Sequence, residues 1–188
     1  DEINGPGGDY IIPNNGHFDT TGANIGAVGI EPVNLFQGNV LEPFDHSRMD
    51  RENPFKGDMD TGRLESLIEE RGRDAIPVIY LTITNNTVAG QPVSMANIRA
   101  VAEIAGKHDI PLFFDACRFA ENAAFIRQFE KGYGNRSIRS IVQEMFGYAD
   151  GFTVSLKKDG LANMGGGLFI RDEGSFMRRF STEKVHMG

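Results

Sequence analysis

The chain has 188 residues, of which 40% are hydrophobic and 24% charged, so it is long enough to bury the core of one globular domain. Its formal charge of -7 and isoelectric point near 5.1 exclude the positive potential expected of a protein that binds nucleic acid or an anionic membrane. No apolar run is long enough to span a bilayer, and no secretory signal pattern is visible. A single cysteine, Cys117, excludes an internal disulfide framework and favours a reducing cytoplasm.

The first part of the sequence is rich in Gly, Pro and Asn, which predicts turns and loops with short extended segments between them. Such segments are expected at residues 10–12, 26–31 and 32–36. The tract GHFDTT at 16–21 places an aromatic ring beside a carboxylate and two hydroxyls. Thr20 and Thr21 either contribute to a polar site or cap the turn that follows. Residues 41–57 are polar and predict an excursion on the surface.

From residue 60 onward, helices alternate with apolar strands. Capping residues followed by apolar positions at helical spacing predict helices after Asp60, Ser94 and Ser137. Further helices are expected at 120–130 and 175–180. Apolar runs predict buried strands at 77–84, 110–114 and 152–154, and a further apolar run at 168–170 follows a glycine-rich turn. Short connections between strand, helix and strand favour right-handed crossovers, so we expect an α/β fold whose mainly parallel sheet is flanked by helices.

Two adjacent lysines, Lys157 and Lys158, lie where a predicted strand ends and a loop begins. Clefts in open α/β sheets form outside the carboxyl ends of their strands. A lysine in such a cleft loses part of its water shell, and a neighbouring cation disfavours its protonated form. Both effects favour a free amine that can form a Schiff base. The alternative is a solvated lysine pair on the surface.

Three predicted strands carry polar residues at their carboxyl ends: Asn86, then Asp115 with Arg118, then Ser155 with Lys158. In a parallel sheet these ends lie on one rim. A carboxylate, an amine and nearby amide or guanidinium donors are what pyridoxal phosphate requires, because the carboxylate keeps its pyridine nitrogen protonated and the donors bind its ring oxygen.

Other kinds of site are less well supported. An aspartate after a strand also suits a magnesium ligand in a nucleotide hydrolase, but no GxxxxGK[ST] motif accompanies it. Residues 165–167, GGG, do not form GxGxxG and favour a tight turn. No G-x-S-x-G motif is present. Cys117 has no histidine placed to activate it, which favours a buried small residue. The histidines lack the spacing of metal ligands; they are His17, His46, His108 and His186.

Four ordered motifs carry a specific resemblance. They are FDTT at 18–21, TITNNTVAGQPVSMANIRAV at 82–101, FFDACRFAENAAFI at 113–126 and SLKKDGLANMGGGLF at 155–169. Together they resemble the β-eliminating lyases, the family of tryptophanase and tyrosine phenol-lyase. The resemblance implies pyridoxal-phosphate enzymes with the aspartate-aminotransferase (fold type I) architecture.

By this resemblance, Lys158 is the Schiff-base lysine and Asp115 the carboxylate partner of the pyridine nitrogen. Asn86 and Arg118 correspond to the groups around the phenolic oxygen of the ring. Phe18 corresponds to the aromatic residue that stacks on the ring.

Four further positions match family features. Ser155 resembles a serine that contacts the cofactor phosphate, and Lys157 the neighbouring lysine that tunes the site. Asn163 lies where the family offers a backbone oxygen to a monovalent cation, usually potassium. Asp19 is similar to the tryptophanase form of the FDTT motif, since tyrosine phenol-lyase carries a threonine there. Departures from the family pattern occur at His17, at 85–90 and at Gly160.

The resemblance corresponds to the central large-domain portion of such an enzyme, so residues 1–188 are expected to be a fragment of a pyridoxal-phosphate-dependent large domain. The family's glycine-rich phosphate loop lies upstream of this portion. The arginine that binds the substrate carboxylate lies in a small domain downstream, and tyrosines are donated across a dimer.

The resemblance implies a carbon–carbon lyase of amino-acid metabolism that cleaves a tryptophan-like L-amino acid to an aromatic product, pyruvate and ammonia. Asp19 would orient the leaving group. A homo-oligomer, dimer or tetramer, is implied as well. Two alternatives stay open: a fragment without catalytic activity, and a relative that eliminates from another β-substituted amino acid, such as a cysteine derivative.

Overall fold

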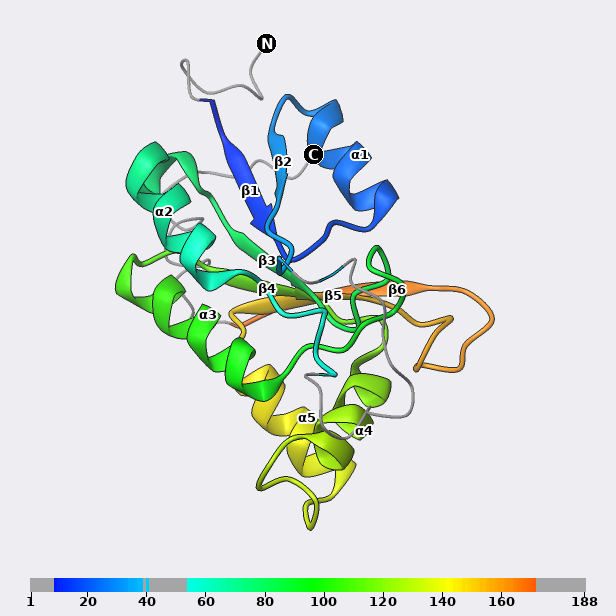
Figure 1. The fold of residues 1–188 in the computed structure, drawn as a ribbon. Coiled ribbons are helices and arrows are strands. Elements are labelled where there is room, and N and C mark those ends of the chain that lie inside the picture. The colour runs from blue at the N-terminus through cyan, green and yellow to red at the C-terminus, as the bar shows by residue number, and fades with distance from the viewer. Residues whose placement is uncertain (1–8, 39, 41–53, 172–188) are drawn as a thin grey trace.

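A computed structural model describes residues 9–38, 40 and 54–171 (Figure 1). Its strands are β1 (Ile11–Asn14), β2 (Glu31–Asn34), β3 (Ile79–Thr82), β4 (Leu112–Asp115), β5 (Gly151–Ser155) and β6 (Gly166–Ile170). Its helices are α1 (Asp19–Ala27), α2 (Thr61–Arg71), α3 (Met95–Lys107), α4 (Phe119–Phe129) and α5 (Ile138–Gly147), with a 3-10 turn, η2 (Arg73–Ala75).

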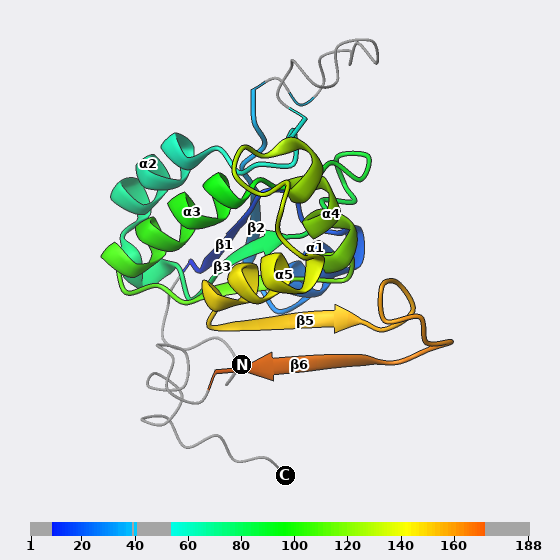
Figure 2. The ribbon, with the colours of Figure 1, turned by 90° about the horizontal axis from the view of Figure 1, so that it is seen from below.

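The strands form one six-stranded sheet in the order β2-β1-β3-β4-β5-β6. All neighbouring pairs are parallel except β5 and β6, which form an antiparallel ribbon at one edge (Figure 2). The expected mainly parallel α/β fold is therefore confirmed. Because β1, β3, β4 and β5 run in the same direction, their carboxyl ends share one rim, and the loops that follow them meet there.

The predicted caps of three helices are confirmed. The Asp60 carboxylate accepts a hydrogen bond from the Arg63 N–H, and the Ser94 and Ser137 hydroxyls accept from backbone N–H groups three residues further on. These side chains satisfy N–H groups that have no partner inside the helix, and so they fix where each helix begins. Helices α2 and α3 lie side by side, as do α4 and α5 (Figures 1 and 2).

One buried apolar cluster joins the sheet to α2, α3, α4 and α5. Phe114, at the centre of β4, is fully buried. Its ring lies 6.1 Å from that of Phe146 on α5, and Phe146 in turn lies 4.5 Å from Phe152 on β5. The runs that form β3 and β4 are thus almost fully buried, as expected of strands covered on both faces, whereas Leu168 and Phe169 on the edge strand β6 are exposed.

Two expectations about the first sixty residues are wrong. Residues 26–27, expected to be extended, end helix α1, which has no buried residues and so lacks the apolar stripe that would reveal a helix in sequence. Residues 55–57, expected on the surface, are buried. A Cβ on Gly57 would lie 2.3 Å from the Gln91 carbonyl oxygen, so only glycine permits this close packing. The helix expected at 175–180 lies outside the described residues.

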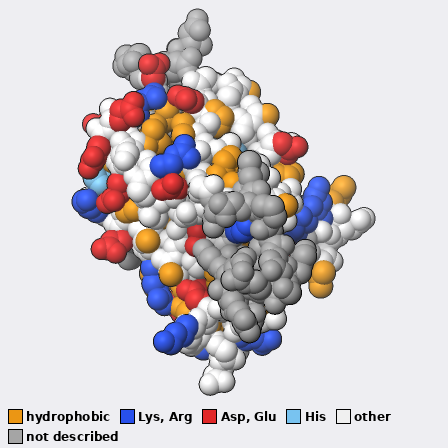
Figure 3. All heavy atoms as spheres, viewed as in Figure 1, with side chains coloured by type: hydrophobic (Ala, Val, Ile, Leu, Met, Phe, Trp, Pro, Cys, Tyr) orange, Lys and Arg blue, Asp and Glu red, His pale blue; other side chains and the backbone are white. Residues whose placement is uncertain are grey.

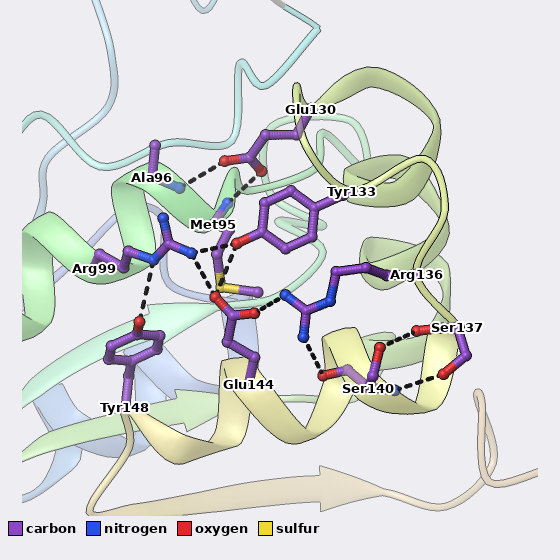
Figure 4. Close-up of polar contacts among 10 residues, drawn as sticks. All are labelled: Met95, Ala96, Arg99, Glu130, Tyr133, Arg136, Ser137, Ser140, Glu144 and Tyr148. Carbon is purple, nitrogen blue, oxygen red and sulfur yellow. Dashed lines mark hydrogen bonds and ion pairs between the residues drawn. The ribbon is translucent and has the colours of Figure 1, made fainter.

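A polar cluster fixes α3 and α5 against the loop that follows α4 (Figure 4). Glu144 of α5 accepts a 2.5 Å hydrogen bond from Arg99 of α3 and a 2.8 Å hydrogen bond from the buried Tyr133 hydroxyl, and it also pairs with Arg136. Glu130 accepts hydrogen bonds from the Met95 and Ala96 N–H groups at the start of α3.

Acidic and basic side chains are interspersed over the face shown in Figure 3, so neither sign of charge dominates this face. Among the described helices, none combines the length and the apolar character needed to cross a membrane.

Candidate functional site

A cavity of about 360 Å³ opens on the rim formed by the carboxyl ends of β3, β4 and β5. Its size falls within the usual range for pockets that bind small molecules. Seven of the residues singled out in the sequence line it, although they come from four separate segments. They are Phe18, Asn86, Asp115, Arg118, Ser155, Lys157 and Lys158.

The register of the sheet explains one row of the lining. Thr82 of β3 pairs with Asp115 of β4, and Asp115 pairs with Thr153 of β5. Residues opposite each other on neighbouring strands present their side chains to the same face. A carboxylate thus stands between two threonines in the cavity wall, and neither threonine was identified from the sequence.

Cys117 is a functional candidate that sequence reasoning missed. It was expected to be a buried small residue, but it is half-buried and lines the cavity. Burial raises the pKa of its thiol to about 11, and the hydrogen bond to Asp115 acts in the same direction. The protonated thiol therefore donates to Asp115 Oδ1 over 3.0 Å, while its sulfur accepts the Ser155 N–H over 3.2 Å. Its position two residues after Asp115 was the signal available in the sequence.

The loop that carries Asn86 is tied to the segment that carries Phe18. Thr87 donates its hydroxyl hydrogen to the His17 carbonyl over 2.5 Å. The buried Asn85 side chain donates to the Asn15 carbonyl over 2.9 Å. These contacts bring the ends of β1 and β3 together, so residues far apart in the chain face the same cavity.

Buried amides replace backbone pairing at this junction, where β1 and β3 share only one register pair, Asn14 with Tyr80. The Asn15 side chain accepts from the Thr82 N–H over 2.7 Å and donates to the Gly57 carbonyl over 2.7 Å. The Asn14 side chain accepts from the Gly16 N–H over 2.9 Å. Residues 14–17, in the Gly- and Asn-rich tract that predicted a loop, thus form a buried polar seam between β1 and β3.

His17 lies in the same seam. Its Nδ1 is 2.8 Å from Asn34 Oδ1, and burial lowers its pKa, so the neutral ring is favoured. Among the described residues, three buried polar atoms have no hydrogen-bond partner: Asn14 Nδ2, His17 Nε2 and Asn85 Oδ1. They belong to residues at or just after the carboxyl ends of β1 and β3, and these residues are outside the cavity lining.

Arg118 occupies the N-cap position of α4. Its backbone N–H donates to the Ile83 carbonyl over 3.3 Å, and its carbonyl accepts from the Thr84 hydroxyl over 3.4 Å. Its guanidinium is 3.8 Å from Glu121, a pair that is partly exposed and therefore weak. The guanidinium is thus available to a ligand in the cavity.

Two predicted residues lie outside the cavity lining. Asp19 is exposed at the start of α1, and its Oδ1 accepts the Thr20 N–H over 2.8 Å. Asn163 is exposed in the loop between β5 and β6. Thr20 and Thr21 do line the cavity, whereas α1 begins without a side-chain cap. The polar-site interpretation of these threonines is therefore preferred to the capping one.

The donor set fits pyridoxal phosphate. One cavity holds two amines, a guanidinium, a carboxylate, an amide and an aromatic ring, with a serine and threonines around them. The cations suit an anionic phosphate and phenolate, the carboxylate suits a protonated pyridine nitrogen, and the amine suits an aldehyde. The described residues contain no group of acidic, cysteine and histidine side chains arranged to hold a metal ion.

Curated relatives match the sequence closely. The chain matches the profile of the beta-eliminating lyase family over residues 6–186. It is 52% identical to a tryptophanase of Salinibacter ruber over 167 residues, which cover 89% of the chain and 34% of the relative. It is 54% identical to a tyrosine phenol-lyase of Clostridium tetani over 135 residues, covering 72% of the chain and 29% of the relative. The chain thus spans about a third of the length of these relatives.

Solved structures show the same fold at low sequence identity. A Leishmania major threonine aldolase superposes with a TM-score of 0.57 at 19% identity, covering 88% of the chain and 41% of that protein. The Oryza sativa protein TDC, crystallised with PLP and tryptamine, gives a TM-score of 0.56 at 15% identity, covering 92% and 30%. These likenesses show a fold of the aspartate-aminotransferase type. With the family match over nearly its whole length, the chain belongs to the β-eliminating lyase family.

Proposed function

We propose that these residues form the cofactor-binding core of a pyridoxal-phosphate-dependent carbon–carbon lyase that acts on an aromatic, tryptophan-like L-amino acid. The observation that carries the proposal is the convergence of seven predicted residues on one cavity at the sheet rim. In such an enzyme, pyridoxal phosphate supplies an electron sink for the charge that develops at the α-carbon of the amino acid.

Each residue has a defined task in this proposal. Lys158 would hold the cofactor by condensing its amine with the aldehyde, with loss of one water, and the same amine would move the α-proton. Asp115 holds a proton on the pyridine nitrogen. Arg118 and Asn86 donate hydrogen bonds to the phenolic oxygen, and Phe18 covers one face of the ring.

The remaining predicted residues act at the edges of the site. Ser155 contacts the cofactor phosphate, and Lys157 is the neighbouring lysine that tunes the site. Asp19, at the start of α1, orients the aromatic leaving group, and the Asn163 carbonyl binds a potassium ion. We further propose that residues 1–188 are the large-domain portion of a cytoplasmic homo-oligomer, with the substrate-carboxylate site supplied from elsewhere.

Borohydride trapping tests the cofactor and the lysine. The protein expressed from its complete coding sequence is mixed with pyridoxal phosphate, reduced and digested, and pyridoxyl-lysine is located by mass spectrometry. Label concentrated on Lys158 is expected. Label spread over many lysines, or its absence, would contradict the proposal and favour a chain without catalytic function.

Substrate class is tested by measuring pyruvate released from L-tryptophan, L-tyrosine and an S-alkyl-L-cysteine. We expect the highest kcat/KM for L-tryptophan. A preference for the cysteine derivative would keep the lyase assignment and overturn the aromatic specificity.

Asp115→Ala should reduce turnover roughly 100-fold or more, because the charge that develops in the transition state loses its fixed electrostatic partner. The fold should survive, as judged by circular dichroism. Near-normal elimination by this variant would contradict the role of Asp115 as partner of the pyridine nitrogen.

A further inference from the structure

The loop that presents the two lysines is docked onto a helix that has no cap of its own. Helix α4 begins after Arg118, whose side chain makes no capping hydrogen bond. Instead, Asp159 Oδ2 accepts the Ala120 N–H over 2.6 Å and the Glu121 N–H over 3.2 Å. Asp159 immediately follows Lys158 in the chain and lies 38 residues or more from these partners.

This contact suits a carboxylate. The first N–H groups of a helix have no partner within the helix, and the helix dipole favours negative charge at that end. One oxygen of Asp159 satisfies two such groups at once. The contact is therefore a charge-assisted pair between the lysine loop and α4, stronger than a neutral hydrogen bond.

Most other contacts of the loop are internal. The Leu161 N–H donates to the Lys158 carbonyl over 2.9 Å, and the Ala162 N–H donates to the Leu156 carbonyl over 2.9 Å. Leu161 is 92% exposed and Met164 80% exposed, so these side chains do not hold the loop in place. Within the described part of the chain, Asp159 provides the side-chain hydrogen bonds that join residues 156–164 to another element.

The docking partner is the segment that carries Asp115, Cys117 and Arg118 of the site. The α4 N-terminus follows directly on Asp115 and Arg118, which line the cavity. The Asp159 N–H also donates to the Cys117 carbonyl over 3.4 Å, and the Ser155 N–H reaches the Cys117 sulfur. The end of β4 and the lysine loop are thus fastened to each other on both sides of the lysine pair.

We propose that Asp159 is a positioning residue, which fixes the register of the lysine loop on α4 and thereby selects Lys158, rather than Lys157, as the amine that faces the cofactor. This inference rests on the proposed function, because it assumes that Lys158 is the attachment point. Both lysines line the cavity, so the amine that faces the cofactor depends on how the loop is held.

The test measures the distribution of pyridoxyl label between Lys158 and Lys157 after borohydride reduction of the full-length protein. In Asp159→Ala, the ratio of label on Lys158 to label on Lys157 should fall roughly tenfold, because misplacement by about 1 Å strongly reduces a reaction that depends on orientation. Asp159→Asn, which keeps an oxygen acceptor for the Ala120 and Glu121 N–H groups, should restore most of the ratio.

Asp60→Ala is the matched control. The Asp60 carboxylate also caps a helix, but α2 contributes no residue to the cavity lining. The Asp60→Ala substitution should lower the free energy of unfolding as much as Asp159→Ala and leave the ratio of label on Lys158 to label on Lys157 unchanged. Hydrogen exchange without cofactor checks the docking itself, since the Ala120 and Glu121 amides should exchange faster in Asp159→Ala and not in Asp60→Ala.

The outcomes separate the two proposals. Label on Lys158 in the unaltered protein together with an unchanged ratio in Asp159→Ala would overturn the positioning role alone. An equal fall of the label ratio in Asp60→Ala would also overturn the positioning role, because general destabilisation would then explain the change in label. Absence of label on Lys158 in the unaltered protein would overturn the proposed function, and this inference with it.

Discussion

At the scale of single residues, the carboxylate of Asp115 is held by a thiol. Cys117 donates to its Oδ1 over 3.0 Å, and the sulfur is in turn bound by the Ser155 N–H at the end of β5. The thiol has a pKa raised to about 11 and therefore stays protonated at neutral pH. It acts here as a donor that orients Asp115, not as a nucleophile.

Cys117→Ala should lower kcat roughly tenfold, since a hydrogen bond to a charged group is lost and Asp115 can rotate. Cys117→Ser keeps a donor and should retain most of the turnover. Steady-state kinetics on both variants measures the difference. Equal rates for the alanine and serine variants would contradict a role for the donated hydrogen bond.

At the scale of elements, the start of α3 carries two carboxylates. Ser94 caps the helix, and Asp58 accepts hydrogen bonds from the Ser94 N–H over 2.7 Å and from its hydroxyl over 3.0 Å. Burial raises the pKa of Asp58 to about 7; the hydrogen bonds from Ser94 oppose this shift, and the negative charge of Glu130 adds to it. Asp58 thus titrates near neutral pH in the folded protein.

The stability contributed by Asp58 should fall as the pH rises. Its pKa in the folded state, about 7, exceeds the ordinary value of 3.8, so the folded state binds this proton more tightly than the unfolded state. Raising the pH from about 5 to about 8 should therefore lower the free energy of unfolding of the unaltered protein relative to Asp58→Asn, which mimics the protonated form. Denaturant unfolding of both proteins at both pH values measures this difference. An equal difference at the two pH values would contradict the shifted pKa.

The polar cluster of Figure 4 joins α3 and α5 through Glu144. Glu144→Ala should lower the free energy of unfolding by about 1–3 kcal/mol, because the buried Tyr133 hydroxyl loses its acceptor. The exposed Glu103 on α3 is the matched control, and Glu103→Ala should change stability by less than about 0.5 kcal/mol. Urea denaturation compares the two, and equal effects would show that the cluster contributes no specific stability.

At the scale of the whole molecule, the site depends on a single core. The buried cluster extends from α2 through the central strands to α5, and the cavity lies at the end of those same strands. Rigid strands hold the site residues on short loops, so that loss of the core would disperse the site.

Phe114→Ala should therefore lower the free energy of unfolding of the whole protein by about 3–5 kcal/mol, because a fully buried ring is replaced by a cavity. Phe169→Ala on the edge strand β6, where the residue is 51% exposed, should cost much less. Thermal unfolding followed by circular dichroism provides the comparison. Similar melting temperatures for the two variants would contradict the central place of Phe114.

The sequence by itself determined the fold class, three helix caps and seven residues of the cavity lining. Apolar runs, capping residues and strand-end polar residues are local signals, and parallel strands necessarily bring their carboxyl ends together. Asp115 and Lys158 could be placed on one rim for this reason.

Only the tertiary structure decided features that depend on contacts between distant residues. Helix α1 has no apolar stripe, so nothing in its sequence distinguished residues 26–27 from an extended segment. The role of Cys117 arises from two partners on different strands, and that of Asp159 from a helix 38 residues or more away. Such pairings are set by the register of the sheet and the path of the loops, which no local pattern encodes.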